Sequence, residues 1–256
     1  MQSPRFAVVL FTAAALATCL QPAFGETTAE KGRAVLEANK AVVVTVVATL
    51  SISYGGNDRE SETWANATVI DPTGLCVLSL TPLDPSSQHK RLEGGGREMT
   101  SKVKGMKILL PDDTELAAEI VLRDTDLDLA FIRPTEKPEA SMAHVDLANP
   151  GAPQLLDEIA IICQLGKVAR RAHAVLIERI ESVLDKPRTS YVVGEHRSRD
   201  VLCSPAFTLD GKFVGIGVFR TIRSKTQRGL GGDTLVVIVP AEDIKEGTGQ
   251  VPPFEE

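Results

Sequence analysis

Few residues of this chain could carry out nucleophilic hydrolysis. Such chemistry needs a serine or cysteine that attacks, a histidine that takes its proton, and a carboxylate that orients the imidazole. Cys203 and Ser204 stand side by side in VLCSPAFTLDGKFVGIGVF, residues 201–219, and Asp128 precedes an apolar run in DLDLAFI. The chain has four histidines, which are His89, His144, His173 and His196. Any active site must be assembled from these few groups.

The cysteines give no sign of a metal site or a disulfide framework. Cys19 lies in an apolar N-terminal stretch, and the other three are Cys76, Cys163 and Cys203. No pair has the spacing of metal ligands, and an odd number of thiols leaves at least one free or bonded to another chain. We therefore expect no metal and no cofactor, and the sequence alone assigns no disulfide.

Short β-rich runs separated by turn signals dominate the chain. The first run, Ala41–Ser53, is rich in β-branched residues, and the turn signals include Asp71-Pro72-Thr73-Gly74. Further strands are predicted at Trp64–Ile70, Leu75–Leu80, Met106–Leu110, Glu115–Leu122, Leu129–Arg133, Glu158–Cys163, His173–Val183, Thr189–Val193, Ala206–Thr208, Lys212–Phe219 and Thr234–Val239. Two groups of about six strands predict an all-β fold of two packed six-stranded barrels, about 41–134 and 154–239.

The remaining segments are predicted to be helices, a loop, a linker and a tail. Thr27–Lys40 reads as a short amphipathic helix capped by Thr27 or Thr28, with Ala34, Val35 and Ala38 on one face. A second short helix is expected at 240–246, followed by a disordered tail at 247–256. Asp84–Gly105 is polar and glycine-rich, so a surface loop is expected there, and 135–153 should link the two halves.

Four stretches together resemble the trypsin-like serine proteases of the HtrA type. They are ATVIDPTGLCVLSLTPL (67–83), LPDDTELAAEIVLRDTDLDLAFIRP (110–134), LDEIAIICQLG (156–166) and LCSPAFTLDGKFVGIGVF (202–219). The resemblance covers about residues 41–246 and implies a double β-barrel with a cleft between the barrels. It extends to the protease domain only, and no peptide-binding PDZ module is expected to follow.

Within this resemblance only one member of the catalytic triad is retained. Asp128 stands at the aspartate position, although it could equally serve only to close a turn. Thr81 occupies the histidine position, and threonine has no group that titrates near neutral pH. Leu202 occupies the serine position, with Cys203 and Ser204 in place of two glycines that ease a tight backbone path. Ala65-Asn66-Ala67 likewise replaces a glycine-serine-glycine; Asn66-Ala67-Thr68 also reads as a glycosylation sequon, but we favour a strand start.

Two residues are alternative nucleophiles. Cys203 could attack as a thiolate if a base or a positive charge lowered its pKa, and His196, Arg197 and Arg199 are near it in sequence. Ser204 could serve after a two-residue shift in register, with a new base such as His89. The simpler interpretation is that Cys203 is a small buried side chain and that the histidines are surface residues.

The N-terminus and the composition suggest export. Arg5 is followed by the uncharged run Phe6–Leu20 and by small residues up to Gly25, which predicts a signal peptide over 1–25. The apolar run is too short for a permanent membrane span. A lipid anchor at Cys19 is a less favoured alternative. Removing residues 1–25 takes away one basic and no acidic residue and changes the net charge from −6 to −7, which does not suggest nucleic acid as a partner.

Three functions are compatible with these features. The first is a periplasmic or extracellular pseudoprotease that binds a polypeptide or protein partner through the old cleft or through surface loops. Asp84–Gly105 and the basic segment 220–228 are candidate loops, although either could be an ordinary solvated loop. The second is an active serine-type or cysteine-type endopeptidase with rearranged residues. The third is a subunit that supports an active relative in a homo- or hetero-oligomer through the helix at 27–40.

Overall fold

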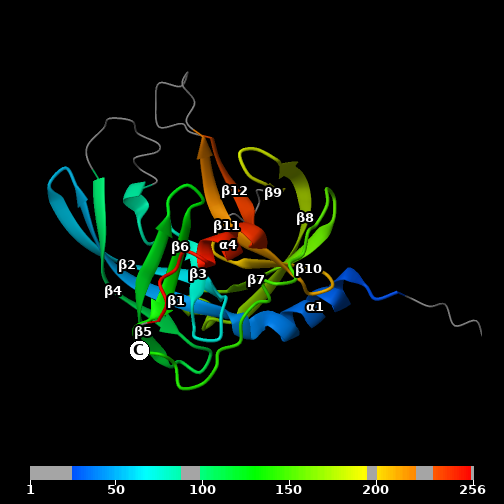
Figure 1. Ribbon diagram of the computed structural model, residues 1–256, viewed down its shortest axis with the longest axis horizontal. Coiled ribbons are helices and arrows are strands. Elements are labelled where there is room, and N and C mark those ends of the chain that lie inside the picture. Colours follow the sequence, from blue (N-terminus) through cyan, green and yellow to red (C-terminus); the bar gives the residue numbers. More distant parts are fainter. Residues whose placement is uncertain (1–24, 88–98, 195–200, 223–232, 255–256) are drawn as a thin grey trace, which may run out of the picture.

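The computed structural model describes residues 25–87, 99–194, 201–222 and 233–254. The predicted signal peptide, Cys19, His89 and His196 therefore lie outside the described residues. The described chain forms two closed β-barrels, with helix α1 (Thr28–Asn39) packed on the second and helix α4 (Ala241–Thr248) following the last strand (Figure 1). The predicted all-β fold with two six-stranded barrels and a short helix near each end is confirmed.

The first barrel is closed by the long strand β1, which pairs with β2 on one side and with β4 on the other. The registers place Val43 opposite Thr68 of β2 and Thr45 opposite Leu109 of β4. All its neighbouring strands are antiparallel, in the order β1-β2-β3-β6-β5-β4. The strands are β1 (Val43–Tyr54), β2 (Asn57–Val69), β3 (Cys76–Ser79), β4 (Met99–Leu109), β5 (Glu115–Asp124) and β6 (Leu129–Pro134).

The second barrel repeats this arrangement. Its order, β7-β8-β9-β12-β11-β10, is that of the first barrel with each number raised by six. Two 3-10 turns, η1 (Lys40–Val42) and η2 (Lys167–Ala169), precede β1 and β8. The strands are β7 (Glu158–Gln164), β8 (His173–Leu184), β9 (Ser190–Val193), β10 (Pro205–Thr208), β11 (Phe213–Ile222) and β12 (Asp233–Pro240). Duplicated antiparallel barrels of this kind are compatible with a trypsin-like double barrel.

Three apolar clusters stabilise the molecule. One fills the first barrel around Val46, Leu78 and Ile108, and another fills the second barrel around Ile161 and Ile238. The third and largest lies between the barrels and also takes up α4. Its members include Val43, Leu75, Leu129 and Phe131 from the first barrel, Ile162, Phe207, Ile216 and Val239 from the second, and Ile244 of α4. The barrels therefore share one continuous core.

Helix α1 docks on the second barrel by a face that matches the sequence prediction only at Val35. Thr27 caps it through a capping box with Glu30, as expected. Its buried residues are Gly32 and Val35, however, whereas Ala34 and Ala38 are exposed. The small Gly32 lets the helix approach β8 so closely that an added Cβ would lie 2.9 Å from the Ile177 side chain. Close approach, and not apolar count, selects this face.

The predicted polar loop at Asp84–Gly105 is wrong in its last part. Met99–Gly105 belongs to β4 and pairs with β1, with alternating exposure along the strand. The polar residues of this segment hid the strand, because one face of β4 here is turned to solvent. Residues 88–98 lie outside the described residues. In the described part of the chain, no helix has the length and apolar character needed to cross a membrane.

Candidate functional site in the cleft between the barrels

The structure brings the predicted aspartate and histidine positions together. β3 and β6 are paired, with Ser79 opposite Leu129, so the residues flanking these ends meet. Thr81 donates its hydroxyl proton to Oδ1 of Asp128 at 2.8 Å. The Ser79 hydroxyl donates to Oδ2, and the backbone N–H of Phe219 in β11 lies 3.4 Å from the same oxygen. Asp128 is therefore a buried carboxylate held by hydroxyl and amide donors from both barrels.

The backbone of Asp128 also adopts an uncommon conformation. Its φ of 58° lies in the left-handed region, which aspartate tolerates better than most residues. Its carbonyl oxygen accepts the N–H of Leu80 at 2.8 Å, which ties the end of β3 to the start of β6. The hydroxyl groups beside Asp128 do not titrate near neutral pH, so this arrangement orients a carboxylate without a general base next to it.

Leu202 stands where the resemblance places the nucleophile, and its side chain packs against the apolar core of the first barrel. Its backbone bridges to Gly217 of β11. Only glycine fits at position 217, because an added Cβ would lie 2.1 Å from the Val201 carbonyl oxygen. Leucine offers no nucleophilic atom, so the residue at this position contributes apolar surface.

The backbone N–H groups that follow Leu202 are used inside the protein. Cys203 has a φ of 65°, and its N–H donates to the Gly217 carbonyl at 2.8 Å. The N–H of Ser204 donates to the Val201 carbonyl at 3.1 Å. An oxyanion hole needs N–H groups aimed at the substrate, and neither of these two is aimed there.

Cys203 is a buried thiol. Its residue is 1% exposed, and burial raises the pKa of the thiol to about 12, with the nearby Asp128 acting in the same direction and hydrogen bonds from Ser79 opposing it. A thiol with this pKa is protonated at neutral pH, whereas attack needs the thiolate. Cys76, Cys163 and Cys203 are all buried.

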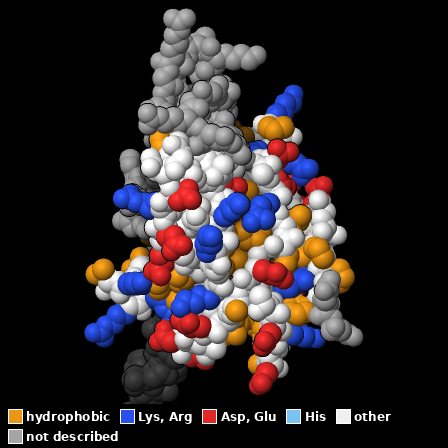
Figure 2. Space-filling view, turned by 90° about the vertical axis from the view of Figure 1, so that its left-hand side faces the viewer, with side chains coloured by type: hydrophobic (Ala, Val, Ile, Leu, Met, Phe, Trp, Pro, Cys, Tyr) orange, Lys and Arg blue, Asp and Glu red, His pale blue; other side chains and the backbone are white. Residues whose placement is uncertain are grey.

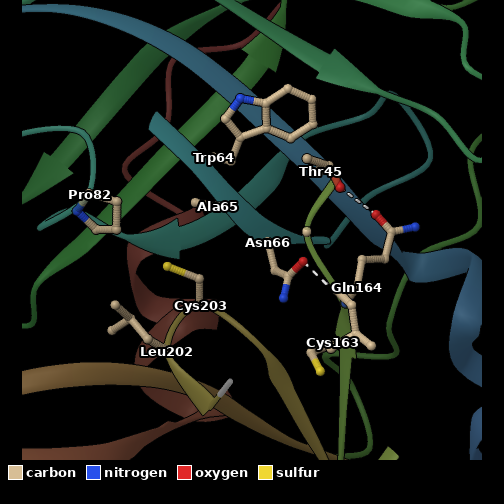
Figure 3. A pocket seen from close by; sticks show the side chains of 11 residues that line it. Thr45, Trp64, Ala65, Asn66, Pro82, Cys163, Gln164, Leu202 and Cys203 are labelled. Atoms are coloured by element: carbon tan, nitrogen blue, oxygen red, sulfur yellow. Dashed lines mark hydrogen bonds between the residues drawn. The ribbon is translucent and has the colours of Figure 1, made fainter. Parts of the chain in front are cut away.

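Ser204 belongs to a chain of hydrogen bonds that crosses between the barrels. Asn66 of β2 donates its amide to Ser204 Oγ at 3.1 Å, and Asn66 Oδ1 accepts the backbone N–H of Gln164 at 3.2 Å. Thr45 of β1 donates to Gln164 Oε1 at 2.5 Å (Figure 3). Gln164 Nε2 lies 3.2 Å from His173 Nε2. We call Ser204, Asn66, Gln164, Thr45 and His173 the polar chain. Asn66 is the donor in its hydrogen bond to Ser204 Oγ, so it does not act as a base toward the Ser204 hydroxyl.

The two described histidines lie away from the predicted triad positions. His173 is half-buried in β8 beside Gln164, and burial lowers its pKa, so it is neutral at neutral pH. His144 lies in the linker between the barrels, where its Nδ1 is 3.1 Å from the Met142 carbonyl.

A cavity of about 200 Å³ lies beside these residues, between the two barrels (Figure 3). Trp64 forms part of its wall, with the Lys167 ammonium 4.1 Å from the centre of the indole ring. Glu62 accepts a hydrogen bond from the indole N–H of Trp64 at 2.7 Å. It also forms an ion pair with Lys167 at 3.1 Å. The cavity is lined by Thr45, Trp64, Ala65, Asn66, Pro82, Cys163, Gln164, Leu165, Gly166, Leu202 and Cys203.

Sequence reasoning missed several residues of this cavity. Gln164 and Gly166 fall inside LDEIAIICQLG, but nothing in that stretch marks Gln164 as a link between barrels. Trp64 is the only tryptophan of the chain, and that rarity is the one signal that could have pointed to it. Among the described residues, no group of three or more His, Cys, Asp or Glu side chains could hold a metal ion.

Comparison with known proteins gives no match from which a function could be inferred. Neither a protein-family model nor a curated protein matches the chain. The assignment of function therefore depends on the geometry described above.

Proposed function

We propose that this chain is an exported homologue of the HtrA-type serine proteases that does not cleave peptide bonds and binds a polypeptide partner in the cleft between its barrels. The observation that carries the proposal is the hydrogen bond from Thr81 to Asp128, because a histidine would occupy that place in a working triad. Leu202 at the nucleophile position supports the same conclusion.

The alternative nucleophiles give little support to an active peptidase. Cys203 is buried and its pKa is raised to about 12, so the thiol is protonated at neutral pH, whereas attack needs the thiolate. Ser204 is fully buried and accepts a hydrogen bond from an amide, which cannot act as a base.

The cleft has retained features suited to binding. The cavity is open to solvent and combines apolar walls from Leu202 and Pro82 with amide groups from Asn66 and Gln164. Peptide segments need both, since side chains bury apolar surface while backbone groups need hydrogen-bond partners. The lysine over Trp64 further defines one wall.

Active-site labelling tests the loss of catalysis. The purified protein would be treated with a fluorophosphonate and, separately, with iodoacetamide, and modified residues would be mapped by mass spectrometry. We expect no residue to react faster in the folded than in the unfolded protein, because the side chains of Cys203 and Ser204 are both buried. Labelling of Ser204 or Cys203 only in the folded protein at pH 7 would show an active nucleophile and contradict the proposal.

Fluorescence of Trp64 tests the binding role. As the only tryptophan, on the wall of the cavity, it should shift or lose emission when an unfolded polypeptide such as reduced casein enters the cleft. A Gln164→Glu variant places a charge in the cavity and should weaken the titration about tenfold, whereas Glu178→Gln on β8, outside the cavity, should leave it unchanged. Equal titrations for both variants, or none with wild-type protein, would count against binding in this cleft.

A further inference from the structure

The end of the described chain crosses from one barrel to the other. Helix α4 sits in the core between the barrels, with Ile244 buried and Gly247 so close to Phe131 that an added Cβ would lie 2.6 Å from its ring. Beyond it, Val251–Phe254 runs along the first barrel beside β5 and β6 (Figure 1, red). We call Val251–Phe254 the strap. A disordered tail was predicted here, yet these residues lie against the barrel.

Arg133 is the residue that holds the strap. It lies near the end of β6, opposite Glu119 of β5, and only 8% of it is exposed. Its Nη2 donates to the Pro252 carbonyl at 2.8 Å, and its guanidinium lies 5.1 Å from the centre of the Phe254 ring. Arg133 therefore contacts a carbonyl oxygen and an aromatic ring, whereas a buried arginine commonly pairs with a carboxylate.

This arrangement leaves the positive charge of Arg133 incompletely satisfied. Its Nε is buried and has no hydrogen-bond partner, and within the described residues Arg133 forms no ion pair with any carboxylate. A buried guanidinium with an unpaired N–H costs free energy, and this cost weakens the docking of the strap. A segment that brought a carboxylate to Arg133 would avoid it.

The strap also does not fill the groove in which it lies. A space of about 370 Å³ remains there. It is lined by Glu119–Val121, Arg133–Thr135 and Pro252–Phe254. The groove therefore has free volume beside Arg133, whose guanidinium forms no ion pair with a carboxylate of the described residues.

We propose that this groove is a binding site for an extended peptide segment of a partner protein, one that contains prolines, an aromatic residue and a carboxylate, and that the strap is its displaceable intramolecular occupant. The strap shows which features fit: two prolines that favour an extended backbone, and a phenylalanine that stacks on Arg133. The carboxylate is the group that the strap does not supply to Nε. This site is separate from the cleft, so it does not depend on the function proposed above.

Peptide binding to the full chain tests this proposal. The probe is a fluorescein-labelled peptide with the sequence of residues 249–256, GQVPPFEE, followed by fluorescence anisotropy. The tethered strap competes at a high effective concentration, so wild-type protein should bind the peptide weakly. A Phe254→Ala variant, whose strap has lost its aromatic contact, should bind about tenfold or more tightly than wild type.

Further variants assign the interaction to Arg133. In the Phe254→Ala chain, Arg133→Met should weaken peptide binding about tenfold or more, and Arg133→Lys, which keeps the charge without the fork, should give an intermediate loss. Arg123→Met, which removes an exposed arginine elsewhere on β5, should have no effect. A peptide in which glutamate replaces the second proline, GQVPEFEE, brings a carboxylate into the part of the segment that lies in the groove, and it should bind several-fold more tightly than GQVPPFEE. The proposal is overturned if Phe254→Ala does not increase affinity, if Arg133→Met matches Arg123→Met, or if GQVPEFEE binds no more tightly than GQVPPFEE.

Discussion

Three buried threonine hydroxyls show how differently one polar group can be accommodated. Thr81 donates to the Asp128 carboxylate and Thr45 donates to the Gln164 amide, so both hydroxyls have strong partners. Thr68 is fully buried in β2, and its hydroxyl has no hydrogen-bond partner. Burying a hydroxyl group costs free energy of desolvation, and without a hydrogen-bond partner no interaction offsets that cost. Thr68 is therefore a position where the sequence is not optimised for stability.

Thr68→Val should stabilise the protein. Valine has nearly the same shape and removes the unsatisfied hydroxyl, so the free energy of unfolding should rise by about 1 kcal/mol and Tm by about 2–4 °C. Thr45→Val is the matched control, because it removes a hydroxyl that has a partner, and it should lower the free energy of unfolding by about 1–2 kcal/mol. Thermal and urea unfolding measure both changes. A fall in stability with Thr68→Val would mean that this hydroxyl has a partner after all.

At the scale of elements, one loop of the second barrel fastens it to a turn of the first. Arg170 and Arg171 follow η2, and both adopt left-handed backbone angles. The Arg171 side chain, 12% exposed, donates to the carbonyl oxygen of Leu110 from both terminal nitrogens at 3.1 Å and forms an ion pair with Asp113. Arg170 is exposed. Two adjacent arginines of the same conformation thus differ only in what they contact.

Arg171→Ala should destabilise the protein by about 2–3 kcal/mol, because the Leu110 carbonyl and Asp113 lose their partner. Arg170→Ala changes the same residue type at a similar backbone angle, and it should alter stability by less than about 0.5 kcal/mol. Urea unfolding of the two variants compares them directly. If both lose the same stability, the effect comes from the backbone of the loop and not from the contact between barrels.

At the scale of the whole molecule, the sequence predicted the strands better than their assembly. Period-two and β-branched runs located all twelve strands, because local patterns reflect local burial. The two barrels have the same strand order, but the sequence shows no repeat that reveals it. A barrel requires inward-facing and outward-facing residues to alternate, and many different residues satisfy that requirement. β2 and β4 were both predicted too short, because their outer halves are polar and exposed or only partly buried.

The candidate site was predicted in part and for a clear reason. The motifs along the chain placed Thr81 at the histidine position and Asp128 at the aspartate position of a triad. The pairing of β3 with β6 brings these two residues into contact. The bond between Asn66 and Ser204 joins residues 138 positions apart in different barrels, and it depends on how the barrels pack. No local pattern carries that information. Arg133 was overlooked for the same reason, because its partners lie near the end of the chain.

The first barrel is closed, but β1, β2 and β4 extend beyond its closed part. Within the described ladders, the outer parts of β2 and β4 each pair only with β1, so this three-stranded ribbon has two edges beyond the barrel. Exposed edges can recruit strands from other molecules and start aggregation, which charged side chains oppose. Asp58, Glu60 and Glu62 lie on β2, and Lys102 and Lys104 lie on β4. Acidic and basic side chains are also interspersed over the face on this side of the molecule (Figure 2). Charged side chains on such edge strands oppose the pairing of one molecule's edge with another's, so we expect the ribbon to resist intermolecular sheet formation.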